Sequence, residues 1–325
     1  MSPILRSNMT KDELKIVFLG TPEFAVPSLD MLLDEGYNVI ACITQPDRPK
    51  GRGHKLAPPP VKEAAQRHGI PVYQFEKLSR EGVDALSELK PDLMITAAFG
   101  QILSREVLAI PPLGCINVHA SLLPEYRGAA PIEMAVINGE TRTGITTMYT
   151  VYELDAGDIL EQDAIDIPEN ITGGQLREQL SHLGARTLKR TLEKLIDGSL
   201  KRTPQDAALA TYYPMFKKGF GEINWRASAV SIANLVRGCN PAPVAYTYCG
   251  DDKVKILEVS PCGIAGAANP GDILLCDAKK GLYIQAGEGA VEITKLQFPG
   301  KKPMSAKDYL RGKSIDVKRM GRDDS

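Results

Sequence analysis

Two polar side chains stand two residues apart in the apolar segment Cys-Ile-Asn-Val-His, which ends at His119. If this segment is a strand, alternate side chains point to the same face, so Asn117 and His119 face one site. An amide and an imidazole placed in this way can act together on one small reactive group. A single histidine at a strand end is more often structural, so the pair needs support from other residues.

An acidic turn, Glu153–Asp158, follows the apolar segment Gly-Ile-Thr-Thr-Met-Tyr-Thr-Val-Tyr about thirty-five residues later. An aspartate beside a histidine raises the proton affinity of the imidazole and fixes the orientation of the ring. Asp155 is the candidate for this role. Asp-Ala-Gly-Asp is also a common kind of turn, so the catalytic hypothesis depends on the combination of Asn117, His119 and Asp155.

The first 120 residues alternate continuous apolar segments with amphipathic ones, which is typical of a Rossmann-like α/β domain with a mostly parallel sheet. Ligands bind at the carboxyl ends of such strands, where Asn117 and His119 would lie. The first turn, Gly20-Thr21-Pro22, is not Gly-x-Gly-x-x-Gly, so the dinucleotide fingerprint is missing. Strands are expected at 15–20, 38–44, 70–74, 92–99 and 114–119, and helices near 60–68, 81–89 and 102–109.

The second half of the chain begins with the clearest helix, over 172–197, where leucines recur at close to helical spacing. Beyond about residue 208 short β-rich segments alternate with Gly, Pro and Asp, which predicts a small β-barrel. The expected boundaries are a first domain over 14–203, a linker over 204–210 and a second domain over 211–318. Its elements are a helix near 226–236, strands at 243–249, 253–260, 271–277, 280–286 and 290–297, and a last helix at 304–311.

The composition excludes several classes of protein. The chain has 325 residues, 43% of them hydrophobic and 24% charged, with a net charge of −1, so it has no global basic field. No apolar segment approaches the ~20 residues that span a bilayer, and the N-terminus lacks the apolar core of a secretory signal. Six cysteines without a Cys-x-x-Cys pair and four histidines without ligand spacing predict reduced thiols, no metal and a cytoplasmic protein.

The loop Arg-Pro-Lys-Gly-Arg-Gly-His-Lys, residues 48–55, carries four fixed positive charges in eight residues. A solvated flexible loop would have the same composition. The alternative is a surface that contacts phosphate groups.

These segments together resemble the methionyl-tRNA formyltransferase family, from about residue 14 to 313. The Asn-x-His pair and Leu-Asp-x-Gly-Asp are shared with the wider formyltetrahydrofolate enzymes, so they indicate the reaction class. The basic loop and the C-terminal domain indicate the tRNA-specific group. The matching segments are Ile16–Leu29, Thr44–Leu56, Gly114–Pro131, Leu154–Ile159, Gly221–Trp225 and Gly300–Leu310.

The resemblance implies a catalytic set of Asn117, His119 and Asp155 in the first domain. It implies 10-formyltetrahydrofolate as the formyl donor and co-substrate, with no metal, and the α-amine of Met-charged initiator tRNA as the acceptor. We also expect a monomer that does not bind membranes. The implied tetrahydrofolate contacts are Ser121, Leu122, Leu123 and Pro124.

The resemblance further implies that the basic loop meets the acceptor end of the tRNA, with Arg52 at the key position and Arg48, Lys50 and Lys55 beside it. The second domain would be an OB-like barrel that binds tRNA. Further contacts of that domain are expected at Lys217, Lys218, Lys301 and Lys302.

The chemistry of formyl transfer suits these residue types. Attack of an amine on the N10-formyl carbon makes a tetrahedral intermediate whose oxyanion can accept hydrogen bonds from Asn117 and His119. Asp155 would hold His119 and help pass a proton to the leaving nitrogen.

Four positions depart from the family pattern. Glu125 replaces a basic residue, Glu153 a glycine, Phe99 a tyrosine and Ala242 a tryptophan. They leave open a non-catalytic module that binds RNA or folate. Two enzyme alternatives also stay open: a formyltransferase acting on an amino sugar nucleotide and a formyltetrahydrofolate hydrolase.

Overall fold

The computed structural model describes residues 10–50, 55–263 and 268–322. The chain divides into two compact units. The first unit comprises the described residues up to Pro131 together with Arg142–Ile165 and Arg177–Pro214. The second comprises Ile132–Thr141, Asp166–Leu176 and the described residues from Met215 onward.

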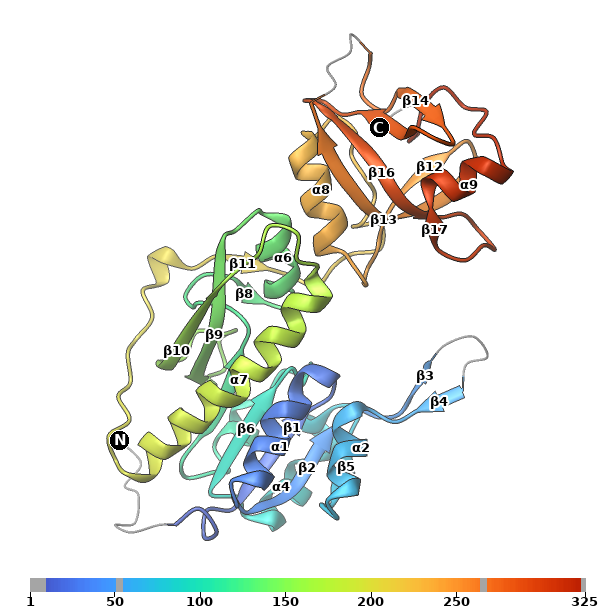
Figure 1. Cartoon of the computed structure of the whole chain (residues 1–325). Coiled ribbons are helices and arrows are strands. Elements are labelled where there is room, and N and C mark those ends of the chain that lie inside the picture. The colour runs from blue at the N-terminus through green and yellow to red at the C-terminus, as the bar shows by residue number, and fades with distance from the viewer. Residues whose placement is uncertain (1–9, 51–54, 264–267, 323–325) are drawn as a thin grey trace. The chain divides into compact units, whose positions relative to one another are not determined.

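The first unit is built on a sheet of seven described strands in the order β10-β9-β7-β6-β1-β2-β5 (Figure 1). The strands from β7 to β5 pair in parallel, and β9 is antiparallel to β7. The predicted mostly parallel α/β sheet is therefore confirmed. The strands are β1 (Ile16–Gly20), β2 (Val39–Thr44), β5 (Val72–Gln74), β6 (Leu93–Ala97), β7 (Cys115–His119), β9 (Arg142–Tyr149) and β10 (Ile159–Asp166).

Helix α7 (Gly173–Ile196) was the clearest expectation and matches its predicted range closely. It runs along the sheet, and its leucines are buried (Figure 1). The approach is close at Gly184, where an added Cβ would lie 2.9 Å from the Val118 side chain. The other helices of this unit are η1 (Glu23–Ala25), α1 (Val26–Asp34), α2 (Pro60–Arg67), α3 (Leu78–Glu81), α4 (Val83–Leu89), α5 (Arg105–Leu108) and η2 (Ala207–Leu209).

Two small strand pairs were not predicted. The basic loop begins and ends in a hairpin of β3 (Arg48–Lys50) and β4 (Lys55–Ala57), which projects from the end of β2 (Figure 1). After α7 an extended segment returns to place β11 (Tyr212–Tyr213) parallel to β8 (Arg127–Gly128). Gly128 has φ +110°, and a Cβ there would lie 2.3 Å from the Tyr213 carbonyl oxygen, so this close pairing requires glycine.

The second unit contains a separate antiparallel sheet, as expected for a β-rich second domain. The strand order is β12-β13-β16-β15-β14, and β17 pairs with β16. The sheet buries its apolar side chains with helix α8, and Trp225 lies at 1% exposure in this core. Its elements are α6 (Pro131–Ile137), α8 (Ala229–Gly238), β12 (Ala245–Cys249), β13 (Asp252–Cys262), β14 (Ile273–Asp277), β15 (Gly281–Gln285), β16 (Ala290–Gln297), β17 (Met304–Ser305) and α9 (Ala306–Gly312).

The six cysteines are free thiols, and Cys42, Cys115 and Cys239 are buried. Burial raises the pKa of Cys42 and of Cys239 to about 12, so both thiols stay protonated at neutral pH. Among the helices of the described ranges, none has the length and apolar character to cross a membrane.

Candidate active site

Strand β7 carries Asn117 and His119 between β6 and β9 in the first unit. In the sheet register Asn117 lies opposite Thr96 of β6. The Thr96 hydroxyl donates a 2.8 Å hydrogen bond to Oδ1 of Asn117. Because the amide oxygen is used in this way, the NH2 end is the part of Asn117 that can donate to a substrate oxygen.

The His119 ring is held from one side by the backbone. Its Nε2 lies 2.9 Å from the Tyr126 carbonyl oxygen. A carbonyl only accepts, so Nε2 carries a hydrogen and Nδ1 of the neutral ring is the nitrogen that can take up a proton. Nδ1 faces Asp155, with 3.8 Å between it and Oδ2. That separation is too long for a direct hydrogen bond and too short for another group to fit between the two atoms, so a shared partner would lie beside them.

Asp155 occupies a backbone conformation that is unusual for a residue with a side chain, with φ +49°. Its Oδ2 accepts a 2.8 Å hydrogen bond from the Gly128 N–H of β8. The side chains of His119 and Asp155 are only 7% and 13% exposed. The structure thus brings together the two residues that the sequence had placed in separate motifs, in a nearly enclosed position.

Cys115, two residues before Asn117, is fully inside the sheet. Burial raises the pKa of its thiol to about 11, partly offset by hydrogen bonds to Thr150 and Thr96. The thiol therefore stays protonated near neutral pH and does not supply a nucleophile.

The segment from Ser121 to Pro124 follows β7 directly and is tied to β9. The Leu123 N–H donates to the Thr146 hydroxyl over 3.1 Å, and Gln162 donates to the Leu123 carbonyl over 2.9 Å. The Ser121 hydroxyl donates to the Glu125 carbonyl over 2.7 Å. Ser121 and Leu123 are buried, whereas Leu122 and Pro124 are partly exposed. The segment is thus a fixed loop, and its accessible side chains are Leu122 and Pro124.

The expected tRNA-binding residues lie on other elements than Asn117, His119 and Asp155. Arg48 and Lys55 stand on the β3–β4 hairpin, and β2, from which the hairpin projects, is separated from β7 by β1 and β6. Arg52 lies outside the described residues, as does the side chain of Lys50. Arg48 pairs with Glu76 at 2.5 Å.

The base of this hairpin is anchored by an ion pair between Lys62 and Asp47, at 2.9 Å. The hydrogen bonds from Lys62 and then from Gln74 hold the pKa of the Asp47 carboxyl below its usual value. The carboxylate therefore stays charged at neutral pH and keeps the hairpin base in place.

The structure describes the surroundings of three of the four departures from the family pattern. Glu153 lies 3.6 Å from Arg105, and both side chains are more than half exposed. Phe99 is buried at 4%, and its carbonyl accepts hydrogen bonds from Thr21 and Gln45. The backbone contacts at Phe99 do not depend on the side chain, and Glu125 likewise contributes its carbonyl to Ser121.

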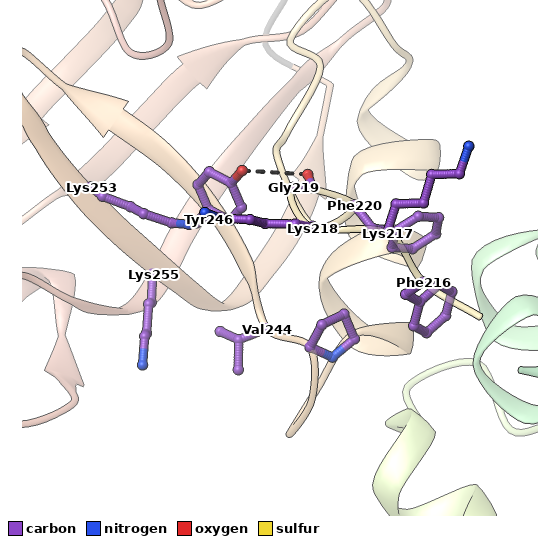
Figure 2. A pocket seen from close by; sticks show the side chains of 11 residues that line it. Phe216, Lys217, Lys218, Gly219, Phe220, Val244, Tyr246, Lys253 and Lys255 are labelled. Carbon is purple, nitrogen blue, oxygen red and sulfur yellow. Dashed lines mark hydrogen bonds between the residues drawn. The ribbon is translucent and has the colours of Figure 1, made fainter. Parts of the chain in front are cut away.

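A pocket of about 320 Å³ opens in the second unit. Its lining includes Tyr246 and the four lysines Lys217, Lys218, Lys253 and Lys255. In Figure 2 Lys253 reaches toward Tyr246, whereas the Lys217 side chain points away from it. The Lys253 ammonium lies 3.4 Å from the centre of the Tyr246 ring. Burial, followed by the hydrogen bond to Glu222, raises the pKa of Tyr246 to about 12, so the ring stays neutral.

The pocket lysines were only partly anticipated. Lys217 and Lys218 were expected to face RNA, and Lys301 and Lys302 are exposed but do not line this pocket. Lys253 and Lys255 were missed. Their alternation on β13, which puts both on one face, was the signal that could have found them.

A family model described as Formyl transferase matches residues 14–192, and one described as Formyl transferase, C-terminal domain, matches residues 215–314. A relative named methionyl-tRNA formyltransferase from Ruminiclostridium cellulolyticum is 50% identical over 307 residues, covering 94% of this chain and 98% of the relative. One of the same name from Bacillus subtilis is 46% identical over 305 residues, covering 93% and 96%.

Solved structures share the fold at lower identity. The sugar 3N-formyl transferase WlaRD matches with a TM-score of 0.63 at 20% identity, covering 89% of this chain and 99% of that chain. HypX from Aquifex aeolicus, solved with tetrahydrofolic acid, matches with a TM-score of 0.62 at 18% identity, covering 91% of this chain. This chain spans 46% of HypX. At these identities the likeness supports the fold alone.

Proposed function

This chain belongs to the formyl transferase family, and we propose from that premise that it formylates Met-charged initiator tRNA with 10-formyltetrahydrofolate. Relatives close to half identical over nearly their whole length carry the name methionyl-tRNA formyltransferase. The observation that carries the proposal is the arrangement of His119 opposite Asp155, beside an Asn117 amide whose oxygen is already bonded to Thr96.

In the proposed reaction the α-amine of the methionyl group attacks the formyl carbon of the folate. A carbon–nitrogen bond forms to the amine, and the formyl oxygen becomes an oxyanion that accepts a hydrogen bond from the Asn117 NH2 group. Nδ1 of His119 takes the proton that the attacking amine loses, with the Asp155 carboxylate beside the imidazolium. That proton passes to N10 of the folate as the bond between the formyl carbon and N10 breaks.

The folate would lie along the fixed loop from Ser121 to Pro124. Leu122 and Pro124 offer apolar surface there, and Leu154, next to Asp155, is 58% exposed. A flat aromatic co-substrate can cover such side chains and exclude water from the reacting carbon.

Two basic surfaces would bind the tRNA. The first is the basic loop at 48–55, with Arg48, Lys50, Arg52 and Lys55. The second is the lysine pocket of Figure 2, whose lining includes four lysines and the neutral Tyr246 ring, groups that suit phosphates and a base. The second domain, which we place at 211–318 after a catalytic domain at 14–203 and a linker at 204–210, would be an OB-like tRNA-binding barrel.

Purified protein incubated with 10-formyltetrahydrofolate and Met-charged initiator tRNA should produce formyl-methionyl-tRNA. His119→Ala should lose this turnover and keep folate binding, because the ring acts on the proton rather than on the pterin. If the protein formylated an amino sugar nucleotide but not the tRNA, the acceptor would be the sugar nucleotide. If it released formate from the folate with no amine acceptor present, it would be a hydrolase.

The same assay can test tRNA binding separately from the formyl-transfer step. Arg52→Ala and Lys253→Ala should raise KM for the tRNA and leave KM for the folate unchanged, and added salt should weaken tRNA use in the wild type. Unchanged tRNA kinetics in both variants would remove these surfaces from the proposal. The reaction needs no metal, and we place it in the cytoplasm with the protein as a monomer.

A further inference from the structure

The segment between α7 and β11 is mostly exposed. From Lys201 to Leu209 each residue is exposed except Gln205, which is partly buried. The segment leads to β11, which pairs with β8 (Figure 1). A polar side chain that alone turns inward from an exposed segment has a specific partner to reach.

Gln205 uses both ends of its amide group. Nε2 donates to the carbonyl oxygens of Asp155 over 2.8 Å and of Gly157 over 2.7 Å. Oε1 accepts from Nε and Nη2 of Arg127 over 3.1 Å and 2.6 Å. Four hydrogen bonds therefore fix the orientation of the amide, because a flipped group would set donors against Arg127 and its oxygen against two carbonyls.

Arg127 is itself held in place. It is 4% exposed, and its Nη1 donates to the Tyr212 hydroxyl of β11 over 2.9 Å. A buried guanidinium bonded to the Gln205 oxygen polarises the amide and strengthens the hydrogen bonds that its nitrogen donates. The contacts thus run from Arg127 through Gln205 to the backbone of Asp155.

The turn that Gln205 holds contains the strained Asp155, with φ +49°. On its other side the Asp155 carboxylate accepts from the Gly128 N–H. Gly157 has no space to shift toward β9, because even a Cβ there would lie 1.7 Å from the Tyr149 carbonyl oxygen. Backbone strain of this kind persists only where the surroundings impose it, and Gln205 supplies two of the restraining bonds.

We propose that Gln205 is a positioning residue for formyl transfer, which acts by holding the Asp155 carboxylate at its working distance from Nδ1 of His119. This inference rests on the proposed function. The His119 ring is fixed independently by the Tyr126 carbonyl. Asp155 is therefore the partner whose position depends on the turn, and the 3.8 Å gap between them is the quantity that Gln205 controls.

Two substitutions separate the contacts of Gln205. Gln205→Glu keeps an acceptor for Arg127 and removes the donors to Asp155 and Gly157. Gln205→Met keeps the length of the side chain and removes both sets. Asp206→Ala is the matched control, because the Asp206 side chain caps η2 by accepting from the Ala208 N–H, a contact within its own segment. It loosens the same segment without touching the Asp155 turn.

Both Gln205 variants should lower kcat for formyl-methionyl-tRNA formation by about 10- to 100-fold, as expected when a catalytic group is displaced by about 1 Å. KM for the tRNA and for the folate should stay within about twofold, because no binding group is removed. Asp206→Ala should keep the wild-type kcat. Wild-type turnover in Gln205→Glu would overturn the proposal, and so would an equal loss in Asp206→Ala.

A spectroscopic readout distinguishes positioning from general loosening of the fold. The chain has four histidines, so imidazole NMR signals of protein labelled at histidine can be assigned by His119→Ala. In Gln205→Glu the His119 signals should shift and those of His68 and His182 should not. Unmoved His119 signals would overturn the proposal even if kcat fell.

The NMR comparison also tests the positioning role of Gln205 independently of the proposed function. A wild-type protein that did not formylate Met-tRNA would contradict the proposed function, whereas the NMR comparison needs no substrate. Thermal melting of the variants checks that the fold is retained, and a variant that melts below the assay temperature is replaced by Gln205→Leu, which removes the same contacts with a different shape.

Discussion

Nδ1 of His119 and Oδ2 of Asp155 face each other across 3.8 Å, while Nε2 on the opposite side of the ring is bonded to the Tyr126 carbonyl. The ring therefore has one fixed nitrogen and one nitrogen that faces a carboxylate across a gap. A shared proton donor, such as an attacking amine or a water molecule, can hydrogen-bond to both atoms from a position beside this gap. Proton transfer at this site would then use Nδ1 and leave Nε2 in its backbone bond.

Asp155→Asn removes the negative charge and keeps the size of the side chain. We expect kcat for formyl transfer to fall by about 10²- to 10⁴-fold, which is the usual contribution of acid–base catalysis. KM for the folate should stay close to the wild-type value. Steady-state kinetics at several folate concentrations measures both, and a variant within threefold of the wild-type kcat would exclude Asp155 from the proton transfer.

Thr96→Val tests the orientation of Asn117. Valine has the shape of threonine but cannot donate to Oδ1, so the amide can rotate and present its oxygen to the oxyanion. We expect a loss of about 1 kcal/mol in transition-state stabilisation, roughly fivefold in kcat. Thr96→Ser keeps the hydroxyl and should retain most of the activity. Equal rates for the two variants would show that Thr96 does not orient the amide.

Glu76→Gln tests whether the ion pair with Arg48 restrains the basic hairpin. Both side chains are more than half exposed, at 59% for Arg48 and 57% for Glu76. Removing the carboxylate makes the charge of Arg48 available to phosphate, so KM for the tRNA should fall by up to about fivefold at low salt. The gain should vanish at high salt. Glu88→Gln, which removes an exposed charge on α4, is the control and should leave KM unchanged.

Thr247→Val tests the core of the second unit. The indole of Trp225 donates a 2.9 Å hydrogen bond to the Thr247 hydroxyl, and both residues are 1% exposed. Valine would leave a buried N–H without a partner, at a cost of about 1–3 kcal/mol in the free energy of unfolding. Trp225 is the single tryptophan of the chain, so its fluorescence during urea unfolding reports on this unit. An unchanged midpoint would mean that the bond contributes nothing.

Several parts of this protein could be predicted from local patterns alone. The alternation of apolar strands and amphipathic helices predicted the parallel sheet, because a strand buried on both faces needs apolar residues throughout. The leucine spacing predicted α7 almost to its ends. The Asn-x-His spacing put two polar groups on one strand face. The longer motifs, by their resemblance to known proteins, identified the family.

The tertiary structure alone decided which distant residues meet. Gln205 belongs to a segment that reads as a surface linker, and nothing in its neighbours indicates that it bonds to Asp155 and Arg127. Lys253 and Lys255 join Lys217 and Lys218 only because β13 and the segment before α8 line one pocket. Periodicity is a local property of the chain, set by the geometry of one helix or strand. A contact between residues fifty or more positions apart depends on how those elements pack, and the side chains that make it carry no period of their own.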